Sequence, residues 1–150
     1  MEELKKDFLD FAYEYYLQYV SSFSSSEQVI PSLLLPLSYI EFAAEETHLF
    51  KLLFMNDMDI NMAEAKDFYN EADNEKRAAA FSETIGVELE RAKVIFLDLF
   101  LYTHGIAVLT AAGKIAFDRG SDEKMLMNLL SAFINQEPSE APNSRRSLIW

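Results

Sequence analysis

The segment VIFLDLFLYTHGIAVLTAAGKI, Val94 to Ile115, is the longest apolar stretch of the chain. Only Asp98, His104 and Lys114 interrupt its apolar residues with side chains that can carry a charge at neutral pH, and it contains no proline. Its leucine and alanine content favours helix. A helix that is apolar on nearly every side must be buried in a core, against a partner subunit or in a bilayer.

The segment is long enough to raise the possibility of a membrane span, which takes about 20 apolar residues. Asp98 near one end, His104 in the middle and amphipathic flanking segments argue against a span, because ionisable groups are costly inside a bilayer. The chain begins Met1-Glu2-Glu3 without an early apolar run, so no secretory signal is visible. We therefore expect a soluble, cytoplasmic protein with no membrane partner.

The composition bounds the fold and the partners. The 150 residues predict one domain, and 50% hydrophobic residues with only 4 Gly and 4 Pro predict an all-α fold. The net charge of −12 disfavours binding to nucleic acid or to an anionic membrane, since both require a basic surface. The absence of cysteine excludes disulfides and thiol chemistry and mildly favours an intracellular location.

Apolar periodicity and breaker residues divide the rest of the chain into about six helices. We expect a helix from Glu2 to about Val20, ended by a loop over the serine-rich residues 21–26. A second helix is expected to begin between Pro31 and Pro36 and to run to about Glu46. Further helices are expected over about 48–55, 62–85 (with a break near 73–74), 88–117 and 123–135, with a turn at 119–122. Thr47 is expected to cap the third of these helices, and Gly86 to precede the central one. Residues 1–136 then form the domain and residues 137–150 a flexible tail.

Two acidic motifs resemble metal sites without completing them. Glu45 and His48 have a Glu-x-x-His spacing, but a di-metal centre needs a second such pair, and the other histidine, His104, has Leu101 at that offset. The loop opening at Asp57 has the start of a calcium-binding pattern but lacks its glycine and its final glutamate. No phosphate-binding loop and no nucleophile elbow is present. We therefore expect no metal, no cofactor and no enzymatic activity.

His104, followed by Gly105, interrupts the apolar helix. One interpretation is a buried imidazole with a satisfied hydrogen bond, beside a glycine that lets another helix approach. The other is a polar group in a ligand cavity, where a few placed donors orient an apolar guest. The sequence leaves both open.

The last two helices carry more apolar surface than the other short helices can cover. Such a surface usually marks a partner interface, and two helices that meet their symmetry mates form the four-helix bundle of many homodimers. Small residues from Gly105 to Gly113 permit close approach of helices there. The alternative is that these small residues face only the core of one chain.

Two stretches resemble a known family. YIEFAAEETHLFKLLF (Tyr39 to Phe54) and LFLYTHGIAVLTAAGKI (Leu99 to Ile115) resemble the C-terminal regulatory domain of TetR/AcrR-type bacterial transcriptional repressors, and the helix order over residues 1–136 is also similar. The chain departs from the family pattern at Phe100, where a Trp is often found, and at Thr47, where Pro is common. The family's N-terminal helix-turn-helix is absent from this sequence.

The resemblance implies a TetR-like C-terminal domain of about six helices that binds a small, mainly apolar effector and homodimerises through its last two helices. DNA would be bound only through the missing N-terminal domain. Candidate ligand-binding residues are His104, Phe100, Phe54 and Met55. Candidate dimer-interface residues are Gly105, Val108, Ala112, Leu126, Leu129, Leu130 and Phe133. The alternative function is a stand-alone helical protein-interaction module that uses the same apolar helices.

Overall fold

The computed structural model describes residues 1–26, 29–56 and 61–136, and the predicted tail of residues 137–150 lies outside them. Over the described ranges the chain consists of helices and loops without a strand, so the all-α prediction is confirmed. The elements in chain order are α1 (Glu2–Ser26), the 3-10 turn η1 (Pro31–Leu33), α2 (Leu34–Glu45), α3 (Thr47–Lys51), the π-helical turn η2 (Leu52–Asn56), the 3-10 helix η3 (Ala65–Asn70), α4 (Ala72–Ile85), α5 (Leu89–Ala111) and α6 (Arg119–Ile134).

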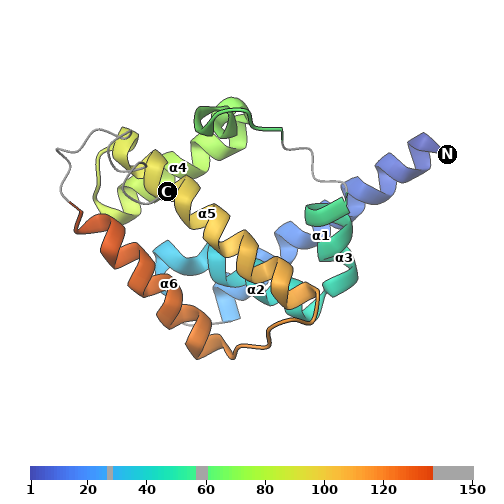
Figure 1. Cartoon of the computed structure of the whole chain (residues 1–150). Helices are drawn as coiled ribbons and strands as arrows, with labels where there is room; N and C mark the ends of the chain where they lie inside the picture. Colours follow the sequence, from blue (N-terminus) through green and yellow to red (C-terminus); the bar gives the residue numbers. More distant parts are fainter. Residues whose placement is uncertain (27–28, 57–60, 137–150) are drawn as a thin grey trace.

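Helix α5, which carries most of the apolar segment, runs through the middle of the molecule (Figure 1). Helices α2, α4 and α6 pack against it, and α1 packs on α2. The N-terminal half of α1 projects from the body (Figure 1). The largest fully buried side chains come from α2, α3, α5 and α6, among them Phe42, Phe50, Ile95 and Leu126. The core therefore forms where α2 and α5 cross.

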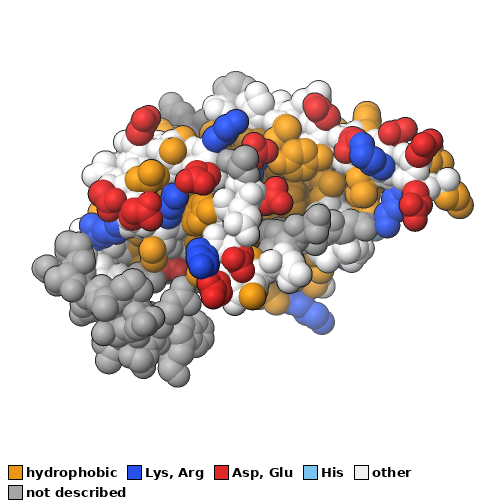
Figure 2. Space-filling model, turned by 90° about the horizontal axis from the view of Figure 1, so that it is seen from above, with side chains coloured by type: hydrophobic (Ala, Val, Ile, Leu, Met, Phe, Trp, Pro, Cys, Tyr) orange, Lys and Arg blue, Asp and Glu red, His pale blue; other side chains and the backbone are white. Residues whose placement is uncertain are grey.

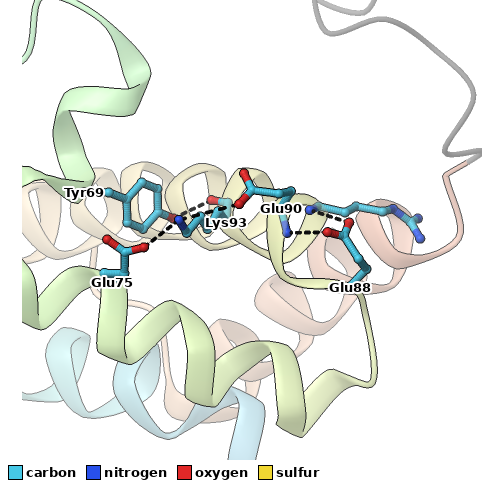
Figure 3. Close-up of polar contacts among 6 residues, drawn as sticks. Tyr69, Glu75, Glu88, Glu90 and Lys93 are labelled. Carbon is cyan, nitrogen blue, oxygen red and sulfur yellow. Dashed lines mark hydrogen bonds and ion pairs between the residues drawn. The ribbon is translucent and has the colours of Figure 1, made fainter.

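Local capping sets both ends of α5. The Glu88 carboxylate accepts hydrogen bonds from the backbone N–H groups of Glu90, at 3.0 Å, and Arg91, at 3.3 Å (Figure 3). These bonds satisfy two of the free first-turn donors. At the other end, Gly113 has φ +71°, a conformation that favours glycine. For this reason α5 ends at Ala111 rather than near the predicted residue 117.

A polar clamp holds η3 and α4 against the first half of α5 (Figure 3). The Lys93 ammonium lies 2.8 Å from a carboxylate oxygen of Glu75 and 5.3 Å from the centre of the Tyr69 ring. The Tyr69 hydroxyl donates to the Lys93 carbonyl at 2.5 Å. Because Lys93 is half-buried and Glu75 is exposed, solvent screens this ion pair, and its main effect is to position η3 and α4 on α5.

The predicted loop at residues 21–26 is wrong, because α1 continues to Ser26. Serine is a weak helix former, but Phe23 within the run is buried. Its ring stacks on Tyr19 at 6.5 Å, and the Arg119 guanidinium lies 4.7 Å from its centre. This packing outweighs the local preference of the serines.

Three other predicted helix limits also differ. Thr47 does not cap α3: its hydroxyl donates to the Ala43 carbonyl at 2.9 Å. The predicted helix over 62–85 is divided into η3 and α4 by Glu71, whose backbone is extended. The predicted turn at 119–122 is the first turn of α6, because the Asp118 carboxylate accepts from the Ser121 N–H at 2.8 Å and so starts the helix earlier.

Helix α5 is long and apolar enough to cross a membrane, with a mean hydropathy of 1.8 in its most apolar window. Core helices of soluble proteins share this length and composition. In this fold the helix packs against α2, α4 and α6, and 39% of that window is buried.

Candidate ligand cavity

A cavity of about 850 Å³ lies between α1, α2, η2, η3, α4 and α5. Its volume is in the range of pockets that hold small organic ligands. Aromatic side chains from six elements form much of its wall, including Tyr16, Tyr39, Phe54, Phe68, Phe81, Phe96 and Phe100. Seen from above, hydrophobic side chains gather in the hollowed middle of the molecule, with acidic and basic groups around them (Figure 2).

Two of the four predicted ligand-binding residues line the cavity. Phe54, on the π-helical turn η2, and Phe100, on α5, belong to its wall. His104 and Met55 do not. Met55 is exposed at the surface, whereas His104 lies behind Tyr39, with its Nδ1 atom 2.7 Å from the Tyr39 hydroxyl.

The hydrogen bond between Tyr39 and His104 holds the Tyr39 side chain in the cavity wall. Burial lowers the pKa of His104 and raises that of Tyr39, so at neutral pH both groups are uncharged. The Tyr39 hydroxyl can then donate to Nδ1, which places the imidazole proton on Nε2. The Phe100 ring stacks on the imidazole with 14° between the planes. His104 therefore acts on the cavity by orienting Tyr39 and Phe100.

Thr103 is a polar group on the cavity wall that the sequence did not single out. It is 4% exposed, and its Oγ1 atom has no hydrogen-bond partner in the described part of the chain. A threonine in a helix commonly bonds the carbonyl four residues earlier, as Thr110 does to Ile106 at 2.8 Å. An unpaired buried hydroxyl is costly, and the Thr103 Oγ1 atom is closed off from water and from the cavity space as the side chain stands.

Arg77, on α4, is a half-buried cation in the same wall. Its Nη2 donates to the Tyr13 hydroxyl at 3.1 Å, and its Nη1 donates to the Asn74 side-chain oxygen at 3.4 Å. Little in the sequence singles out Arg77 as a cavity residue. One arginine before a run of alanines does not indicate which face of the helix lines the cavity. Three acidic residues, Asp10, Glu71 and Asp73, also line the cavity and are exposed.

The predicted dimer-interface residues fall into two groups. Gly105 and Ala112 are exposed, and Val108, Leu129 and Phe133 are half-buried. Leu126 and Leu130 are buried in the core of the chain itself, so they are not part of its exposed surface. Exposed apolar side chains of α5 extend the surface formed by Gly105 and Ala112, namely Val94, Leu101, Tyr102 and Leu109.

We call this row of α5 residues, Val94, Leu101, Tyr102, Gly105, Leu109 and Ala112, the outer stripe. Leu101 is 50% exposed and Leu109 is 45% exposed. A Cβ atom added to Gly105 would meet nothing within 4 Å. The glycine is therefore not required by contacts inside the chain, and it leaves room for another surface to approach.

Metal binding has no support in the described residues, which hold no group of three or more His, Asp or Glu side chains placed around a common point. The loop of the incomplete calcium pattern, 57–60, lies outside the described residues. Comparison of the chain with protein-family models, curated proteins and solved structures gives no match. The resemblance to TetR-type regulators therefore stays a prediction based on the two stretches quoted above.

Proposed function

We propose that the chain is the effector-binding and dimerisation domain of a TetR-like transcriptional regulator, acting in the cytoplasm by binding rather than by catalysis. The observation that carries the proposal is the cavity of about 850 Å³, whose wall consists mostly of aromatic and aliphatic side chains and otherwise of polar ones. A mainly apolar wall that also carries polar groups is typical of sites for small organic ligands.

The cavity wall suggests how a ligand would act. Tyr13 and Tyr16 place α1 in the wall, opposite residues of α4 and α5. A ligand that fits one angle of α1 better than another shifts the population toward that angle, by no more than its difference in affinity for the two states. In the family that the chain resembles, the helix at this place leads to the DNA-binding domain.

Ala80→Phe is expected to weaken the binding of a neutral apolar dye, Nile red, at least about tenfold. Ala80 lines the cavity from α4, so a phenyl ring there would occupy space that the dye needs. Dye fluorescence titrated with protein measures the dissociation constant directly.

The matched control is Ala79→Phe, which makes the same change at the neighbouring exposed position that does not line the cavity. We expect this variant to bind the dye within about twofold of the unchanged chain. Equal loss in both variants, or dye binding that persists in Ala80→Phe, would place the dye elsewhere and contradict the proposal.

Leu101→Glu is expected to weaken homodimerisation at least about tenfold. A charge in the centre of the outer stripe would be desolvated, and by two-fold symmetry would meet its copy nearby. Light scattering after size exclusion, over a range of concentrations, should give near twice 17.2 kDa for the unchanged chain and a lower mass for the variant. Phe11→Glu, an exposed position on α1, is the control and should keep the dimer mass.

The outer stripe also fits the alternative function, a helical protein-interaction module. A monomer at all concentrations, with no response to Leu101→Glu, would remove the dimer proposal. If the dye also failed to enter the cavity, the interaction module would become the better explanation of the exposed apolar residues.

A further inference from the structure

We propose that the cavity takes an amphipathic monocarboxylate, with the carboxylate on Arg77 and the hydrocarbon part among the aromatic side chains. The inference rests on the proposed function, since it names the chemical class of the effector. It is argued from the partners of Arg77, the exposure of the nearby acidic groups and the aromatic side chains of the cavity wall.

Arg77 is placed for an anion that the chain itself does not supply. Both of its side-chain hydrogen bonds go to neutral oxygens, on Tyr13 and Asn74, and no described carboxylate forms an ion pair with it. The Asn74 amide donates to the Phe68 carbonyl at 3.0 Å, which holds the Asn74 oxygen toward the guanidinium. The cation is thus oriented but not neutralised.

A guanidinium suits a carboxylate better than it suits a neutral guest. Its planar arrangement of N–H donors matches the two carboxylate oxygens, and charge-assisted hydrogen bonds are stronger than neutral ones. Two of the five N–H groups of Arg77 serve the tyrosine and the asparagine, so others stay available to a ligand.

The acidic residues on the cavity wall do not cancel this preference. Asp10, Glu71 and Asp73 are exposed, and Asp10 already pairs with Lys6 at 3.2 Å. Solvent screens exposed charges more strongly than a half-buried one. These carboxylates oppose a second negative charge on the ligand, so they favour a monocarboxylate over a dicarboxylate.

The wall itself indicates the apolar part of the ligand. Aromatic side chains from α1, α2, η2, η3, α4 and α5 line the same cavity as Arg77. A hydrocarbon chain can pack on them, whereas a purely hydrocarbon guest would leave the free donors of Arg77 without a ligand partner. An amphipathic acid therefore fits the cavity better than an alkane or an unsubstituted ring.

The experiment measures displacement of Nile red by decanoate and by decyltrimethylammonium, which share a chain and differ in the sign of the headgroup charge. We expect decanoate to displace the dye at lower concentration. In Arg77→Gln, the apparent affinity for decanoate should fall about tenfold or more, and by a clearly larger factor than the affinity for the neutral dye Nile red. Arg77→Lys keeps the charge and should recover part of the decanoate affinity.

Each result separates the headgroup inference from the proposed function. If Nile red does not bind the unchanged chain, the proposed function fails and the inference fails with it. If the dye binds, but decanoate displaces it equally from the unchanged chain and from Arg77→Gln, only the assignment of Arg77 is overturned. Tighter binding of decyltrimethylammonium than of decanoate would likewise overturn it, and would show that the acidic groups dominate.

Discussion

Replacing Phe42 by alanine is expected to lower the free energy of unfolding by about 3–5 kcal/mol, the usual cost of deleting a buried aromatic ring. Phe42 is 0% exposed. Its ring centre lies 5.0 Å from that of Tyr16 and 5.2 Å from that of Tyr19, in edge-on arrangements. The lost ring would leave an empty space bounded by side chains of α1 and α2 that cannot all close on it.

Urea unfolding followed by circular dichroism measures this loss. Phe11→Ala is the matched control, because it removes the same ring from a position that is 68% exposed, and it should change stability by less than about 0.5 kcal/mol. Similar costs for the two variants would show that Phe42 does not carry the contact between α1 and α2. Because Tyr16 and Phe54 pack on Phe42 and line the cavity, dye binding should also weaken in Phe42→Ala.

The helices were predictable from periodicity, whereas their ends were not. The apolar residues between Val94 and Ile115 predicted the central helix, and Gly86 predicted the boundary before it. The end of α1 depends on Phe23 meeting Arg119, which is almost a hundred residues away in the sequence. A prediction based on the helix preference of the serines alone cannot include this contact between distant parts of the chain.

The candidate site was predictable only where residue type alone decides. Phe54 and Phe100 are large aromatics on core-facing helices, so they were foreseeable as cavity residues. Thr103 and Arg77 belong to the same wall through the crossing of α4 and α5, which the sequence does not specify. His104 was singled out for its unusual position, but the structure places it one layer behind, against Tyr39.

Asp122→Asn is expected to stabilise the domain at neutral pH by about 2 kcal/mol. Asp122 is 3% exposed, and its Oδ1 atom has no partner among the described residues. Burial, together with the negative charges of Glu41 and Asp118, raises the pKa of this carboxyl to about 6. A shift of this size corresponds to about 3 kcal/mol, and the loss of a favourable negative charge in the first turn of α6 offsets about 0.5–1 kcal/mol.

The pH profile gives the sign of the effect. The folded chain holds the Asp122 proton up to a pH of about 6, whereas the unfolded chain releases it near the ordinary pKa of 3.8. Folding therefore binds a proton in this window, so the Asp122 contribution lowers stability as pH rises from about 4 to 6 and is constant above that. The midpoint of urea unfolding is measured for both chains over this pH interval. The midpoint of Asp122→Asn minus that of the unchanged chain should increase as pH rises from about 4 to 6. Asp10→Asn, which removes an exposed carboxylate, is the control; a difference for Asp122→Asn that rises no more steeply than that for Asp10→Asn would show that the Asp122 carboxyl is solvated in the folded state.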